Sequence, residues 1–183
     1  MITYDTHVKP FSNTFNKIVI PEEKTIQIKE FVIQLVEKKL QESHHKIDGK
    51  NEYKRYYTGL LGEAALEILL GTDIIDWSIG SSNDYHTPDI KDLKIGIKSV
   101  EYGKFPIIFK SNYYPQIINI RTSKDIVFIC GLATQVTLNK YQSDDLILSP
   151  LLRSRGTKTG FYGFNELIPF NNYDDLKKIS NNL

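Results

Sequence analysis

The sequence predicts an α/β domain, on the border with α+β, in which a central mixed β-sheet is flanked by helices. Three observations predict this class. Apolar residues recur at helical spacing over two long segments between residues 21 and 70. From residue 74 to about 140 the pattern changes to short apolar runs separated by turn residues, which is typical of strands. Helical segments return near the C-terminus, and this order fits a sheet covered by helices.

Length and composition suit one globular domain. The chain has 183 residues, of which 40% are hydrophobic and 25% are charged, ordinary values for a protein with one substantial core. We expect a single domain over residues 1–183, with a helical region at about 21–70 and a sheet core at about 74–140. The apolar runs are too short to span a bilayer, and the N-terminus lacks the pattern of a signal peptide. We therefore expect a cytoplasmic protein with no membrane partner.

The N-terminal part is predicted to contain two long helices after an irregular segment at residues 1–20. Pro21 and the two acids that follow it begin the first helix, which runs to about Glu42. The second helix runs from about Lys50 to Leu70. A loop is expected between them at residues 43–49.

Two glycines interrupt the second helix before Gly71 ends it. Gly59 and Gly62 lie in the helix interior, where each costs about 1 kcal/mol relative to alanine. We interpret this cost as the consequence of close packing between the helix and a flat surface such as a sheet.

Beyond the second helix the sequence predicts strands first and helices later. Turn residues are expected at 81–84, and the later helices are expected at Asp144–Leu152 and at Asn172–Ile179, the latter capped by Asn171 or Asn172. The predicted strands are Ile74–Ile79, Asp89–Leu93, Lys94–Val100, Phe105–Phe109, Ile126–Leu132 and Gln135–Leu138.

The chain has a single cysteine, Cys130. One cysteine excludes an internal disulfide and any zinc site built from several thiolates. Because Cys130 ends the apolar run Ile126–Cys130, we interpret it as a buried strand residue and not as a nucleophile.

The formal net charge is only +1, but basic residues are concentrated in two segments. Six of them lie between residues 93 and 124 beside one acid, and three lie between residues 153 and 158 beside none. Basic faces on a neutral chain fit the binding of a polyanion through one surface. Solvated loops and strand edges are the alternative explanation, and they explain each segment better when it is taken alone. The candidates for phosphate contacts are Lys104, Lys110, Arg153, Arg155 and Lys158.

A carboxylate lies among small and apolar residues in the second helix. Glu63 follows Gly62 and precedes Ala64, so its side chain could reach a neighbouring sheet. A salt bridge or a side chain that extends to water is an equally good explanation for such a glutamate.

Two further segments carry polar residues in strand-like surroundings. Pro88 favours an extended backbone for the residue before it, on the approach to Asp89. Nine residues later, strand alternation places Gly96 and Lys98 on one face and Ile97 on the other.

The order of these three segments resembles the PD-(D/E)XK nucleases, a group that contains many restriction endonucleases, junction resolvases and phage exonucleases. Glu63 matches the acid of the family's helix, and Asp89 after Pro88 matches the aspartate of the Pro-Asp step. Lys98, followed by a small and an apolar residue, matches the lysine of the next strand. The resemblance covers residues 55 to 110, and it implies a restriction-endonuclease-like core with Glu63, Asp89 and Lys98 as the catalytic residues.

The chain departs from the motif at Gly96, where the family has Asp or Glu. The resemblance implies a metal held by Asp89, by the backbone carbonyl of Ile97, and by Glu63 in place of the missing acid. Glu101 is a further candidate ligand, although strand alternation directs it opposite to Lys98. A site that binds nucleic acid without cutting it is the remaining alternative.

The resemblance implies a metal-dependent endonuclease of restriction or phage type that hydrolyses phosphodiester bonds of DNA. Mg²⁺ or Mn²⁺ would neutralise charge on the phosphate, and Lys98 would orient or deprotonate water or stabilise developing charge. The resemblance also implies a possible homodimer, because cutting two strands needs two sites. The alternatives are a catalytically inactive nucleic-acid-binding protein on the same fold and an interaction module unrelated to nucleic acid.

Overall fold

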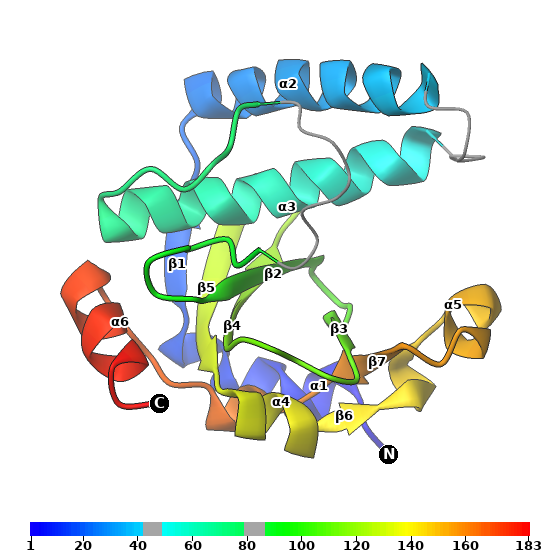
Figure 1. Cartoon of the computed structure of the whole chain (residues 1–183), viewed down its shortest axis with the longest axis vertical. Coiled ribbons are helices and arrows are strands. Elements are labelled where there is room, and N and C mark those ends of the chain that lie inside the picture. The colour runs from blue at the N-terminus through cyan, green and yellow to red at the C-terminus, as the bar shows by residue number, and fades with distance from the viewer. Residues whose placement is uncertain (42–48, 79–86) are drawn as a thin grey trace.

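The computed structural model describes residues 1–41, 49–78 and 87–183 (Figure 1). The predicted loop at 43–49 and the predicted turn at 81–84 therefore lie almost entirely outside the described residues. Within the described ranges, no helix combines the length and the apolar character needed to cross a membrane.

In chain order the elements, with 3-10 helices written η, are α1 (Tyr4–His7), η1 (Lys9–Thr14), β1 (Asn16–Val19), α2 (Glu22–Gln41), α3 (Gly49–Leu70), β2 (Gly96–Glu101), β3 (Ile107–Phe109), β4 (Gln116–Arg121), β5 (Ile126–Ala133), α4 (Gln135–Lys140), β6 (Gln142–Ser143), η2 (Asp144–Leu146), α5 (Pro150–Ser154), β7 (Lys158–Phe161), η3 (Phe164–Glu166) and α6 (Tyr173–Ser180).

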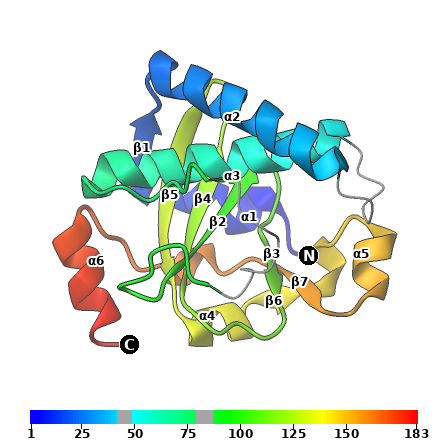
Figure 2. The same ribbon diagram turned by 45° about the horizontal axis from the view of Figure 1, so that its top comes forward.

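The central sheet is mixed and is flanked by helices, as the sequence predicts. Its strand order is β1-β5-β4-β2, with antiparallel pairs β1–β5 and β5–β4 and a parallel pair β4–β2. A second, antiparallel sheet has the order β3-β7-β6. The helices α2 and α3 lie together on one side of the central sheet, and the second sheet lies on the other side (Figures 1 and 2).

The central sheet is buried on both faces. Successive residues of β4 belong to different clusters: Ile117 packs in the core beneath α3, and Ile118 and Ile120 pack in the core against the second sheet. A strand that is covered on both faces carries apolar residues continuously and not in alternation. This explains why the sequence did not predict β4.

Close packing of α3 on the sheet is confirmed at Gly62. A Cβ atom on this residue would lie 1.8 Å from the Oγ atom and 2.9 Å from the Cβ atom of Ser99 in β2, and 3.1 Å from the Nδ2 atom of Asn119 in β4. Gly59 does not have this role, because a Cβ atom there would meet no described atom within 4 Å.

Several other predictions are confirmed. The two long helices, the strands β2, β3 and β5, and the terminal helix α6 match the predicted segments to within a few residues. Asn172 caps α6 by accepting a hydrogen bond from the backbone N–H of Asp175. Gly71 ends α3 with a φ of 66°. Cys130 is buried in β5.

Two predicted strands are wrong because local hydrogen bonds take up the backbone groups. The segment Gln135–Leu138 lies in α4, whose first turn is capped by the side chain of Thr134. In the segment Asp89–Leu93 only Ile90 forms a bridge, with Ile95, and the residues between them form a turn that ends at Lys94 with a φ of 53°.

The other errors lie at the two ends of the chain and after α3. Residues 1–20 contain α1, η1 and β1 and are not irregular. The helix predicted at Asp144–Leu152 is divided into η2 and α5, because Ser149 and Pro150 begin a new helix. Residues 74–78 form no strand, and Ile79 lies outside the described residues.

Alanine substitutions at the two glycines of α3 should have opposite effects on stability. We expect Gly59→Ala to raise the free energy of unfolding by up to about 1 kcal/mol, because it removes backbone freedom without a clash. Gly62→Ala should lower it by about 1–3 kcal/mol, because the new methyl group forces Ser99 and Asn119 to move. Urea denaturation of the wild type and both variants measures the difference, and equal stabilities for the two variants would contradict the close contact at Gly62.

Candidate active site

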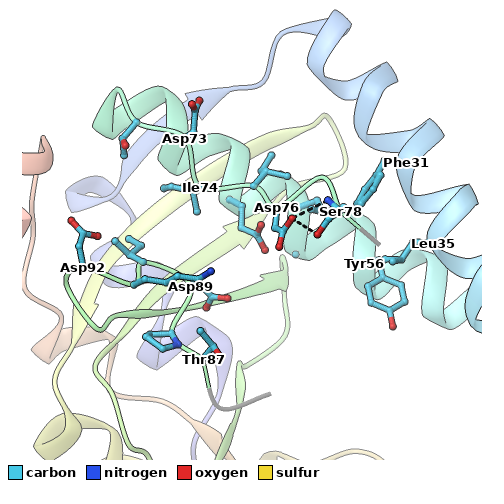
Figure 3. A pocket seen from close by; sticks show the side chains of 18 of the residues that line it. Phe31, Leu35, Tyr56, Asp73, Ile74, Asp76, Ser78, Thr87, Asp89 and Asp92 are labelled. Atoms are coloured by element: carbon cyan, nitrogen blue, oxygen red, sulfur yellow. Dashed lines mark hydrogen bonds between the residues drawn. The ribbon is translucent and has the colours of Figure 1, made fainter. Parts of the chain in front are cut away.

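Glu63 lines a pocket of about 720 Å³ that is bordered by α2, α3, the segment after α3 and residues 87–92. Glu63 directly follows Gly62, so it lies on the turn of α3 that contacts the sheet. In Figure 3, Asp76 and Asp89 lie in the middle of the same pocket, whereas Asp73 and Asp92 lie farther out. The pocket therefore brings together carboxylates from three separate segments.

Glu67 directs the segment after α3 back along the helix. Its Oε1 atom accepts hydrogen bonds from the backbone N–H groups of Ile74, at 3.0 Å, and Ile75, at 2.9 Å, and its Oε2 atom pairs with Lys24 at 2.8 Å. Burial alone would raise the pKa of Glu67, but these hydrogen bonds outweigh it and the pKa is lowered. Glu67 thus remains ionised and holds Asp76 beside Glu63.

Asp76 is the carboxylate that sequence reasoning missed. Its Oδ1 atom accepts hydrogen bonds from the backbone N–H and the hydroxyl group of Ser78, at 2.9 and 2.6 Å, and these bonds lower its pKa. The missed signal is slight, since an aspartate followed two residues later by serine is typical of any turn.

Asp89 lies at the free edge of β2. Its Oδ2 atom accepts a hydrogen bond from the backbone N–H of Ile97 at 2.5 Å. The neighbouring N–H of Gly96 points to the other side, where it donates to Pro115 at the start of β4. Because the N–H and C=O groups of one strand residue point to the same side, the carbonyl group of Ile97 faces the same edge as Asp89.

The side chain of Asp89 is exposed, yet the walls around it displace much of the surrounding water. This desolvation raises the pKa of Asp89, and the N–H group of Ile97 and the positive charge of Lys98 offset part of the effect. Asp89 therefore lines the pocket and also interacts electrostatically with Lys98.

Glu63 has an unusual protonation equilibrium. Burial, and then the negative charges of Asp89, Glu67 and Asp76, raise its pKa to about 8. Its carboxyl group makes no hydrogen bond or ion pair with any residue that the structure describes. Without a nearby cation, Glu63 is mostly protonated at neutral pH.

Lys98 lies on the other face of β2. Ser99 contacts α3 at Gly62, so strand alternation directs Lys98 away from α3. Burial, followed by the positive charges of Lys158 and Arg55, lowers the pKa of Lys98, while Asp89 acts in the opposite direction. Glu63 and Lys98 thus lie on opposite sides of Asp89, and each is coupled electrostatically to Asp89.

A cationic group lies beside Lys98. Lys158 on β7 has a pKa lowered by burial and then by the charges of Arg55 and Arg155. Arg55 extends from α3 and also lines the acidic pocket. Sequence reasoning named Lys158 and Arg155 but missed Arg55, although helical periodicity places it on the same side of α3 as Glu63.

The structure does not bring the other predicted residues to Asp89. Glu101, at the far end of β2, forms ion pairs with Lys104 and, at 3.9 Å, with Arg121. Lys110 pairs with Asp144 at 2.6 Å. Arg153 donates a hydrogen bond to the backbone carbonyl of Ile147 at 2.8 Å and so fixes the chain around α5.

Comparisons of the chain with protein-family models, with curated proteins and with solved structures found no match. The interpretation of the site therefore rests on its residues. Within the part of the chain that the structure describes, no three His, Cys, Asp or Glu side chains approach closely enough to hold a metal ion together. The site offers the carboxylates of Glu63 and Asp89, the backbone carbonyl group of Ile97 and the ammonium group of Lys98.

The raised pKa of Glu63 predicts a pH-dependent effect of Glu63→Gln. The folded protein keeps a proton on Glu63 that the unfolded chain loses above pH 4.5, so wild-type stability falls as the pH rises from 4.5 to about 8. The glutamine variant lacks this loss. We expect its melting temperature in EDTA to exceed that of the wild type by roughly 10 °C or more at pH 9, with little difference at pH 4.5.

Glu67→Gln is the matched control on the same helix. Because the pKa of Glu67 is lowered, its ionised form stabilises the folded state above its ordinary pKa. Relative to the wild type, this variant should lose more stability at pH 7 than at pH 4. A Glu63→Gln effect that does not change with pH would contradict the proposed protonation of Glu63.

Proposed function

We propose that the chain is a metal-dependent nuclease with a restriction-endonuclease-like core that hydrolyses phosphodiester bonds of DNA. One observation supports this proposal above all others. The N–H group of Ile97 holds Asp89 at the free edge of β2, with Glu63 on one side and Lys98 on the other. Acidic groups that suit a divalent cation thus adjoin basic groups that suit phosphates.

The donor set fits Mg²⁺ or Mn²⁺. Burial and the charge of Asp89 raise the energy of the ionised form of Glu63, and Glu63 has no cationic partner among the described residues. The carbonyl group of Ile97 faces the same edge and would add a third oxygen ligand, and magnesium commonly keeps several waters. When bound, the ion would neutralise charge on the phosphate and activate water as a nucleophile.

Lys98 would act on the phosphate or on the attacking water. Its half-buried ammonium group lies beside Asp89, and its lowered pKa reflects burial and two neighbouring cations. A partly desolvated ammonium group stabilises developing negative charge more strongly than an exposed one does. Lys98 would therefore orient water or stabilise the leaving oxygen, and the negative charge of Asp89 favours the charged form of the lysine.

The basic residues around Lys98 fit a nucleic-acid backbone. Lys98 and Lys158 come from β2 and β7, and Arg55 of α3, which forms an ion pair with Glu52 at 2.5 Å, lowers the pKa of both lysines by its charge. A polyanion would relieve the repulsion between the two lysines by neutralising them together. Because one chain contributes one such site, cleavage of both DNA strands requires two copies, and we infer a homodimer on the DNA.

A second candidate function is nucleic-acid binding without cleavage on the same fold. It is favoured by Gly96, which removes the acid that the motif usually supplies. The electrostatic arrangement around Lys98 and Lys158 would still bind phosphates, since it does not depend on position 96.

A plasmid assay separates these functions. We expect the wild type to nick supercoiled DNA in Mg²⁺ or Mn²⁺, and Asp89→Ala and Lys98→Ala to lower the rate about 100-fold or more by removing a ligand and a charge-stabilising group. Asp73→Ala and Lys91→Ala, two exposed residues of the same pocket, are the matched controls and should cut normally. Intact plasmid with salt-sensitive binding would favour the inactive binding protein, and neither cutting nor binding would reject both functions.

The basic group makes a separate prediction about affinity. Lys158→Ala should weaken DNA binding and lower the slope of log affinity against log salt concentration by about one, because one phosphate contact is lost. Lys104→Ala is the control, since its amine pairs with Glu101 far from Asp89. Fluorescence anisotropy in EDTA at several salt concentrations measures both values, and identical slopes for the two variants would contradict the role of Lys158.

A further inference from the structure

The space beside Gly96 is filled by the side chain of Gln116. A Cβ atom on Gly96 would lie 2.4 Å from the Oε1 atom, 2.6 Å from the Nε2 atom and 2.8 Å from the Cδ atom of Gln116. The two residues are partners in the parallel pair of β2 and β4, so their side-chain positions point to the same face of the sheet. The amide group thus occupies the place that a side chain at position 96 would take.

The amide group lies over β2 and not over its own strand. Neighbouring strands are about 4.8 Å apart, whereas the amide atoms of Gln116 lie within 2.8 Å of the Cβ position of Gly96. Gln116 is therefore extended across Gly96 toward the free edge of β2, where Ile97 binds Asp89. Only glycine at position 96 leaves room for this conformation.

The start of β4 is held firmly in this register. The backbone N–H of Gly96 donates to the carbonyl of Pro115 at 2.9 Å, directly before Gln116. The side chain of Gln116 is half-buried, and it makes no hydrogen bond with any residue in the described ranges. A half-buried amide without a partner has an oxygen and an N–H₂ group available for a ligand.

We propose that Gln116 supplies the oxygen ligand that position 96 lacks, so that Asp89 and Gln116 together hold the divalent cation beside Lys98. This inference rests on the proposed nuclease function. A glutamine carbonyl is an accepted oxygen ligand for hard cations. It carries no charge, so it adds a ligand without adding repulsion to Glu63 and Asp89.

The same geometry predicts that an acid at position 96 and the Gln116 amide exclude each other. Gly96→Asp alone would place a carboxylate in the volume that Gln116 fills, so the flexible end of the Gln116 side chain would have to move away from it. The double variant Gly96→Asp with Gln116→Gly places a carboxylate on β2 and removes the side chain that would meet it. The ligand would then come from β2, as in the motif.

Calorimetric titration with Mn²⁺ tests the inference without depending on cleavage. We expect Gln116→Ala to weaken Mn²⁺ binding about tenfold or more, and Gln116→Glu to strengthen it because a carboxylate replaces the amide. The double variant Gly96→Asp with Gln116→Gly should bind Mn²⁺ at least as tightly as the wild type. Gln27→Ala, an exposed glutamine of α2, is the control, and melting curves in EDTA verify that every variant is folded.

The outcomes separate this inference from the proposed function. If Gln116→Ala binds Mn²⁺ like the wild type while Asp89→Ala does not bind it, Gln116 is not a ligand and the nuclease proposal stands. If Mn²⁺ binding depends on Gln116 but plasmid stays intact, the ligand is supported and cleavage is rejected. A wild-type protein that binds no Mn²⁺ overturns both.

Discussion

The contact between Gly62 and the central sheet is the constraint on which the site depends. Here α3 lies so close to Ser99 and Asn119 that no side chain fits at position 62. The adjacent Glu63 lines the pocket, and Glu67, one turn further, binds the backbone of Ile74 and Ile75, so that Asp76 lies in the same pocket. The close packing at Gly62 thus positions the part of α3 from which Glu63 lines the pocket.

Asp89 divides the charges of the site into two groups. Glu63 and Asp76 lie on the side of α3, and Lys98 and Lys158 lie on the opposite face of β2. Burial, and then the like charges of each group, raise the pKa of Glu63 and lower the pKa of Lys98. A cation would relieve the first group and a phosphate the second, which is the pair of ligands that a metal-dependent nuclease brings together.

A residue of β4 fills the space beside Gly96 of β2. Gln116 fills the volume beside Gly96, so the polar group comes from the neighbouring strand and carries no charge. Parallel pairing makes such an exchange possible, because partner residues direct their side chains to the same face.

The sequence by itself determined the long helices, strands β2 and β5, and the opposite directions of Lys98 and Ile97, whereas Glu63, Asp89 and Lys98 as catalytic residues stay a prediction. These features follow from periodicity and from local backbone preference, which neighbouring residues encode. Only the tertiary structure decided that β4 lies beside β2 and that Asp76, Arg55 and Gln116 adjoin the site. It also decided that Glu101 and Lys104 pair with each other at the far end of β2. The physical reason is that strand pairing and side-chain proximity join residues far apart in the chain, and a buried strand or a turn aspartate carries no local pattern that names its partner.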